Sequence, residues 1–288
     1  MEKIIIFGST GQLGSELLRL YPNALGVKHG SNKKDGMSLE DEEKIASFLR
    51  KERPDVIINA AAVTNVDRCE REKEYVYKVN GLAVRNIARI ANEIGTRLVH
   101  ISTDYIFDGA TGFYLEDSVP NPINYYGLSK LAGDLFAQSN KRNLIIRTSG
   151  VYGYSNNFPI FAYYKLKRGE TVLAMESYYS PIHVRNLAVV ISKLMNMMTE
   201  GVVNVAGERV SRVEFARRVA EKFGFDLSLV VKSDLIPLLK AKRPFDTSLN
   251  TQLAKDLVRF DFYSIKSNLE AFEKSISMRV YNFHDANL

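Results

Sequence analysis

The chain has 288 residues, 45% of them hydrophobic and 25% charged, which is an ordinary composition for a globular protein. No apolar run approaches the roughly 20 residues that a membrane-spanning helix needs. The first apolar run, at residues 4–7, is too short for a secretory signal. We therefore expect a cytoplasmic protein with no membrane partner. A single cysteine, Cys69, excludes an internal disulfide, and with only four histidines we expect no metal site.

The net charge is +6, and the basic excess lies in residues 151–288. Lysine and arginine form no dense run, and the sequence has no helix-turn-helix, zinc-finger or RNA-binding pattern. Nucleic acid is therefore not expected as a partner. An anionic small substrate, or solubility alone, explains the charge better.

The N-terminal segment combines a strand with a glycine-rich turn. Residues 3–7 form a short apolar run, typical of a strand that is buried on both faces. Gly8, Gly11 and Gly14 follow at once, and a helical pattern begins at Leu13. Glycines let the backbone approach a pyrophosphate, which then meets the amide groups at the start of a helix. The order strand, glycine turn, helix predicts a dinucleotide site.

A second short strand is expected at residues 25–28. In many dinucleotide sites an acidic residue at the end of this strand holds the ribose 2′-hydroxyl. Here the strand ends at Lys28, and no carboxylate follows until Asp35. A basic loop of this kind favours NADP(H), with a solvated loop that touches no cofactor as the alternative.

The next elements continue the alternation of helix and strand. We expect a helix at residues 38–53, a strand at 55–59 and a long helix at 67–94, followed by a strand at 97–101. Three alanines, 60–62, follow the strand at 55–59, and small side chains there would let a flat ligand approach the backbone. The strand at 97–101 is followed by Ser102 and Thr103, where parallel sheets bind ligands.

Tyr126 and Lys130 are four residues apart on a predicted helix, so their side chains lie on one face. An ammonium group near a phenol favours the phenolate, and such a phenol can exchange a proton with a carbonyl oxygen. Alone this spacing is common, and a solvated helix face would explain it as well. The strand at 144–148 completes five alternations, which predict an α/β fold with a Rossmann-like, doubly wound parallel sheet.

The chain divides, by this pattern, into a dinucleotide-binding domain at residues 1–152 and a smaller C-terminal substrate-binding lobe at 153–288. Some segments of the second part are candidates to return to the first. The expected helices lie at residues 157–168, 184–198, 211–223 and 264–275, and the expected strands at 171–174 and 202–205.

Together these motifs resemble the extended short-chain dehydrogenase/reductase superfamily. Longer strings at 101–109, 124–133 and 147–149, with Arg243-Pro244 and Asp246-Thr247-Ser248, resemble the dTDP-4-dehydrorhamnose reductase family. The resemblance covers most of residues 1–255. It implies reduction of the C4 ketone of a nucleotide-linked 4-keto-6-deoxy sugar by NADPH, with NADH as the alternative cofactor.

The resemblance also assigns roles to residues. Tyr126 would protonate the sugar oxygen, Lys130 would hold the nicotinamide ribose, and Thr103 would orient the ketone. The implied cofactor-binding set is Gly8, Thr10, Gly11, Gln12, Leu13, Lys28, Ala60, Ala61, Ala62, Thr64, Asn80, Tyr126 and Lys130. The implied substrate-binding set is Thr103, Asp104, Tyr105, Asn157 and Phe158.

One departure from the family leaves the exact sugar open. The reductases carry Trp where this chain has Gly150, so an aromatic ring expected against the substrate is missing. Two alternatives to a reductase remain: a nucleotide-sugar epimerase or dehydratase on the same fold, and a non-catalytic subunit resembling the beta subunit of methionine adenosyltransferase. Dehydratases have Thr-Asp-Glu where this chain has Tyr105 in third place. Proteins of this fold often dimerise, which makes a homodimer the candidate assembly.

Overall fold

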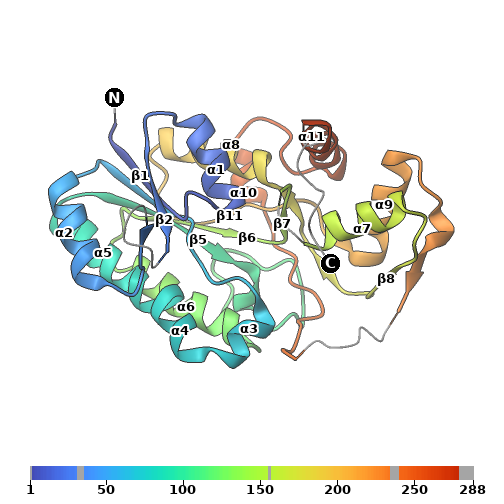
Figure 1. The fold of residues 1–288 in the computed structure, drawn as a ribbon, viewed down its shortest axis with the longest axis horizontal. Helices are drawn as coiled ribbons and strands as arrows, with labels where there is room; N and C mark the ends of the chain where they lie inside the picture. Colours follow the sequence, from blue (N-terminus) through green and yellow to red (C-terminus); the bar gives the residue numbers. More distant parts are fainter. Residues whose placement is uncertain (1, 31–35, 155–156, 234–239, 279–288) are drawn as a thin grey trace.

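The computed structural model describes residues 2–30, 36–154, 157–233 and 240–278 (Figure 1). Its centre is a sheet of seven parallel strands in the order β11-β6-β5-β4-β1-β2-β3. The strands are β1 (Ile4–Phe7), β2 (Leu25–His29), β3 (Gly36–Met37), β4 (Val56–Asn59), β5 (Arg97–Thr103), β6 (Leu144–Thr148) and β11 (Gly201–Asn204). Strands β2 and β3 lie on one side of β1. The chain then crosses to the other side, where β4, β5, β6 and β11 follow outward. The predicted doubly wound sheet is confirmed.

Helices cover both faces of this sheet, and this explains its continuous apolar strands. One layer holds α1 (Gln12–Leu20), α8 (Val184–Asn196) and α10 (Gln252–Leu257); the other holds α2 (Glu42–Glu52), α5 (Ala83–Glu93) and α6 (Tyr125–Ala137) (Figure 1). Successive residues of β1 point to opposite layers. Ile4 and Ile6 pack with Leu17 of α1, whereas Ile5 and Phe7 pack in the other layer.

The long helical stretch predicted at residues 67–94 is helical in the structure and is interrupted once, at Glu72. The structure has α3 (Val66–Arg71), α4 (Lys73–Tyr77), a π-helical turn η1 (Lys78–Leu82) and then α5. The apolar spacing continues through the whole stretch and gives no sign of this interruption. The turn η1 carries Asn80 into the interior, where its amide bonds to Val63 on one side and to Ser129 of α6 on the other.

The C-terminal part of the chain contributes to both regions of the molecule. Helix α8 packs against α1, and β11 extends the main sheet beside β6. The rest of this part forms a smaller lobe to the right in Figure 1. Its elements are β7 (Val151–Tyr152), α7 (Phe158–Lys167), β8 (Val172–Ala174), β9 (Tyr178–Tyr179), β10 (Ile182–His183), β12 (Val210–Ser211), α9 (Arg212–Phe223), η3 (Leu227–Leu229), β13 (Val230–Lys232) and α11 (Ile265–Met278).

The lobe has an aromatic core of its own. The ring of Phe272, on α11, is fully buried and lies 5.4 Å from the ring centre of Tyr152, 5.8 Å from Tyr163 and 5.9 Å from Phe223. Helix α11 is therefore part of the lobe. Among the described residues, no helix has the length and apolar character needed to cross a membrane.

Phe272→Ala tests the contribution of this core. We expect it to lower the free energy of unfolding by about 3–5 kcal/mol, because it removes a buried ring and leaves a cavity. Phe245→Ala is the matched control, since Phe245 is 60% exposed. Urea unfolding followed by circular dichroism measures both, and equal effects of the two substitutions would contradict the role of α11 in the core.

Candidate active site

The glycine turn after β1 brings three backbones into contact. Gly8 has φ +78°, and a Cβ atom on it would lie 2.7 Å from the amide nitrogen of Ala61, after β4. A Cβ atom on Gly14 would lie 2.2 Å from the carbonyl oxygen of Gly8. The N-cap residue of α1 is Gly11, and no side chain caps the helix. The first amide groups of α1 are thus suited to an anion such as a pyrophosphate.

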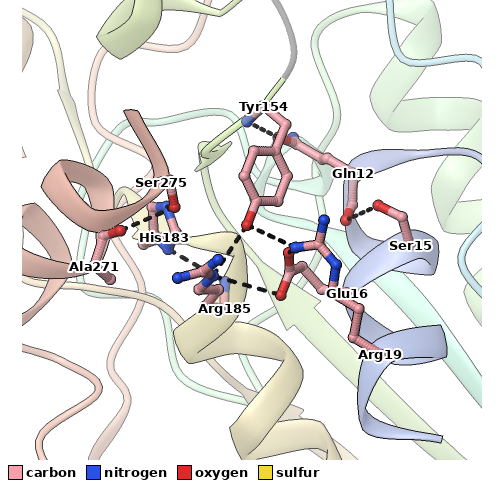
Figure 2. Close-up of polar contacts among 9 residues, drawn as sticks. All are labelled: Gln12, Ser15, Glu16, Arg19, Tyr154, His183, Arg185, Ala271 and Ser275. Carbon is pink, nitrogen blue, oxygen red and sulfur yellow. Dashed lines mark hydrogen bonds and ion pairs between the residues drawn. The ribbon is translucent and has the colours of Figure 1, made fainter. Parts of the chain in front are cut away.

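Side chains near this turn serve different purposes. Thr10 is exposed, whereas the side chain of Leu13 belongs to the core, so at position 13 the backbone is what a cofactor could meet. The amide of Gln12 donates to the carbonyl oxygen of Val151 at 3.0 Å. It also accepts from the backbone nitrogen of Tyr154 at 3.4 Å (Figure 2). Gln12 therefore joins the glycine turn to the chain that leads into the lobe.

The remaining predicted cofactor residues lie along the same edge of the sheet. Lys28 is exposed at the end of β2, and most of the basic loop after it, residues 31–35, lies outside the described residues. Ala60 and Ala62 are partly exposed, Ala61 is buried and Thr64 is exposed. Asn80 is fully buried and bonded to Val63 and Ser129, so it positions the chain after β4 rather than presenting a free amide.

The phenol of Tyr126 meets the hydroxyl of Thr103. Asn124 caps α6 by accepting a hydrogen bond from the backbone nitrogen of Gly127 at 2.9 Å, which fixes the first turn of the helix. Burial raises the pKa of Tyr126 above its usual range, and a hydrogen bond with Thr103 opposes this shift. The ring of Tyr105 stands edge-on to that of Tyr126, with centres 5.8 Å apart. Tyr126 thus keeps its proton at neutral pH, as a general acid requires.

Lys130 lies one turn further along α6, in a buried polar cluster. Its ammonium group donates to the carbonyl oxygen of Ile101 at 2.7 Å and lies 3.4 Å from Nε2 of His100. His100 in turn lies 3.4 Å from Asp134, whose other oxygen accepts from Ser102 at 2.5 Å. The carbonyl oxygen of Ile101, on β5, thus holds the ammonium group in the interior.

The charges of the cluster depend on burial. Burial lowers the pKa of Lys130 to about 8, and Asp134 opposes this shift. Burial, together with the nearby charge of Lys130, also lowers the pKa of His100 to about 4. His100 is therefore neutral at pH 7, and Asp134 is the buried carboxylate that balances Lys130.

Asp104, predicted to contact the substrate, is only 3% exposed. Its carboxyl group accepts from Ser149 at 2.7 Å, from Thr247 at 2.5 Å and from Thr103 at 3.2 Å. Burial raises the pKa of Asp104, while these hydrogen bonds lower it. The side chain therefore holds the ends of β5 and β6 together with the segment after residue 240.

Two other predicted substrate residues start the lobe. Asn157 is the N-cap residue of α7, and its amide also donates to the carbonyl oxygen of Val151 at 3.0 Å. Phe158 and Tyr105 are partly exposed, which leaves both rings accessible to a ligand. Ser149 and Thr247 were not predicted as site residues. Both lie in strings that resemble the reductases, and that was the signal available in the sequence.

A tyrosine paired with a threonine, a buried lysine on the same helix, and a glycine turn at the carboxyl edge of a parallel sheet define the extended short-chain dehydrogenase/reductase class. The particular family follows from a model that matches residues 1–278 and is described as the RmlD substrate binding domain. The chain belongs to this family, the dTDP-4-dehydrorhamnose reductases, and is an oxidoreductase.

Individual relatives agree. The dTDP-4-dehydrorhamnose reductase of Salmonella typhimurium is 36% identical over 269 residues, 86% of this chain and 89% of that protein. A hypothetical dTDP-4-dehydrorhamnose reductase from Sulfolobus tokodaii has a TM-score of 0.88 and 46% identity, covering 93% of this chain and 98% of that one. The Bacillus anthracis enzyme, solved with NADP, has a TM-score of 0.84 and 29% identity, covering 95% and 98%.

Asp134→Asn tests the charge balance of the cluster. Without the carboxylate, the pKa of Lys130 should fall below its value of about 8, so the ammonium would lose its proton at lower pH. If turnover needs the ammonium, the alkaline fall in kcat/KM then shifts to lower pH. Ser102→Ala, which removes the 2.5 Å hydrogen bond but keeps the charge, is the control. If the alkaline fall in kcat/KM stays at the same pH in Asp134→Asn, the role of Asp134 in keeping Lys130 charged during turnover is refuted.

Proposed function

We propose that the protein uses NADPH to reduce the C4 ketone of a nucleotide-linked 4-keto-6-deoxy sugar, converting dTDP-4-dehydro-L-rhamnose to dTDP-L-rhamnose. The observation that carries the proposal is the placement of Tyr126 near Thr103, on the helix that also carries the buried Lys130, in a chain of this family. When bound, NADPH would supply the hydride that adds to C4. Tyr126 would give its phenolic proton to the oxygen, which becomes a hydroxyl.

The other residues of the site support this chemistry. Thr103 would turn the hydroxyl proton that it gives to Asp104 toward the same oxygen and so orient the ketone. Lys130 would keep one positive charge below the reacting centre, which favours transient negative charge on the phenol. The glycine turn and the uncapped start of α1 offer the anion site that a dinucleotide needs. The cytoplasmic location and the homodimer stay predictions.

The epimerase or dehydratase alternative receives less support. A dehydratase needs a carboxylate after the Thr-Asp pair, and here Tyr105 stands there, edge-on to Tyr126. The neighbouring carboxyl group of Asp104 already accepts three hydrogen bonds. The non-catalytic alternative would not require Thr103, Tyr126 and Lys130 together, and all three are present.

A panel of nucleotide-linked 4-keto sugars, followed by NADPH absorbance, is the experiment that tests the proposal. We expect one NADPH consumed for each sugar reduced, with the dTDP-linked 4-keto-6-deoxy sugar among the best substrates. Sugar turnover without NADPH consumption would indicate an epimerase. No turnover of any ketone, together with capture of a protein partner, would indicate a non-catalytic subunit.

Tyr126→Phe should lower kcat by about 10²-fold or more, because it removes the proton donor and keeps the ring. The neighbour Tyr125→Phe is the control, since its side chain has no place in the proposed chemistry. Steady-state kinetics at saturating NADPH measure both variants. Turnover of Tyr126→Phe close to that of Tyr125→Phe would remove Tyr126 from the mechanism.

The protein should bind NADPH more tightly than NADH, because Lys28 lies at the end of β2 where a 2′-phosphate would be held. Lys28→Ala should reduce this preference by about 10-fold, the loss of one charge-assisted hydrogen bond. Lys232→Ala, an exposed lysine on β13 in the other lobe, controls for net charge. Dissociation constants measured at one salt concentration test this, and a preference for NADH would overturn it.

A further inference from the structure

The position of the missing aromatic residue is occupied by a ring from another element. A Cβ atom added to Gly150 would lie 2.7 Å from both Cδ2 and Cε2 of Tyr179, on β9. Real side chains do not pack so closely, so position 150 can carry no side chain while Tyr179 keeps its place. The reductases that this chain resembles have their tryptophan at position 150.

Tyr179 is fixed firmly by its neighbours. The guanidinium group of Arg212 lies over its ring at 4.5 Å from the centre, and Arg212 is itself held by a 2.8 Å hydrogen bond to Ser177. The ring of Phe215 stands at 72° to that of Tyr179, with centres 6.1 Å apart. The tyrosine is 3% exposed, yet its hydroxyl has no hydrogen-bond partner among the residues that the structure describes. A buried hydroxyl of this kind is costly unless it is paired.

The reacting groups are close by. The backbone nitrogen of Ser180, next to Tyr179, donates to Ser149 at 3.2 Å, and Ser149 donates to Asp104 beside Thr103. Tyr105 is close to both sites. Its ring stands edge-on to that of Tyr126, and it adds to the effect of burial, the main cause, in raising the pKa of Tyr179. Position 179 is thus linked to the end of β5, at Thr103 and Asp104, by a path of hydrogen bonds through Ser180 and Ser149.

We propose that Tyr179 replaces, from β9, the aromatic side chain that the family carries at position 150, and that its hydroxyl bonds to the sugar of the substrate. This inference rests on the proposed function and adds a residue that determines which sugar is accepted. A buried hydroxyl that pairs with a sugar oxygen discriminates against analogues that lack this oxygen. A tryptophan at position 150 would instead present its indole N–H from the segment between β6 and β7.

Tyr179→Phe is the first test, because it removes the hydroxyl and keeps the ring. We expect KM for the 4-keto sugar nucleotide to rise about 5-fold, within the range for one lost hydrogen bond, while kcat stays within about 2-fold. Calorimetry should show weaker binding of dTDP-L-rhamnose but unchanged binding of dTDP and of NADPH. Tyr178→Phe, whose ring packs against Arg209 at 3.7 Å, is the control.

The reciprocal exchange is the second test. Gly150→Trp alone should lower the melting temperature, because its Cβ atom would meet the ring of Tyr179. Adding Tyr179→Gly should recover most of this loss and bring the KM back toward that of the natural chain. A melting temperature that Gly150→Trp leaves unchanged, or that the second substitution does not recover, would show that the two positions do not share this space.

The outcomes separate this inference from the proposed function. A wild-type protein that reduces the sugar, with Tyr179→Phe identical in KM and in binding, would overturn the role of Tyr179 alone. A wild-type protein that binds dTDP-L-rhamnose more tightly than dTDP but reduces no ketone would overturn the reductase. In that case the loss of sugar affinity in Tyr179→Phe would still support the contact. Binding of neither nucleotide would overturn both.

Discussion

The geometry of the site depends on the buried carboxyl group of Asp104. It accepts hydrogen bonds from hydroxyl groups on three segments that are far apart in the sequence. The donors are Thr103 on β5, Ser149 after β6, and Thr247 in the segment before α10. A carboxyl group removed from water is stable only when its oxygens are bonded, so each of these segments is fixed in place by the others.

A second polar cluster joins the main sheet to the lobe on the side of the glycine turn (Figure 2). The hydroxyl of Tyr154 accepts from Arg19 at 3.2 Å and from Arg185 at 3.0 Å. Both arginines also face Glu16, a buried carboxylate on α1, at 2.5 Å and 3.7 Å. Because α1 begins at the glycine turn, the start of the lobe and the anion site are held by the same helix.

The sequence predicts those parts of the site that depend on neighbouring residues. The glycine turn and the Tyr126–Lys130 spacing are local patterns, and the buried strands are continuous apolar runs. The π-helical turn η1 could not be predicted, because its Asn80 bonds to Val63 and Ser129, which are distant in the sequence. The partners of Asp104 and the contact between positions 150 and 179 are likewise set by the fold, since no local spacing relates such distant residues.

The buried polar cluster around Lys130 shows how the fold places one positive charge at the site. The carbonyl oxygen of the Asn59 side chain accepts from the backbone nitrogen of Ala61 at 3.2 Å, so its amino group faces Nδ1 of His100 at 3.3 Å. A neutral His100 that accepts at Nδ1 carries its proton on Nε2, the nitrogen beside Asp134. His100 then cannot accept from Lys130 as well, and the ammonium is left with the carbonyl oxygen of Ile101. The ammonium group of Lys130 is therefore held by a neutral acceptor on β5, the carbonyl oxygen of Ile101.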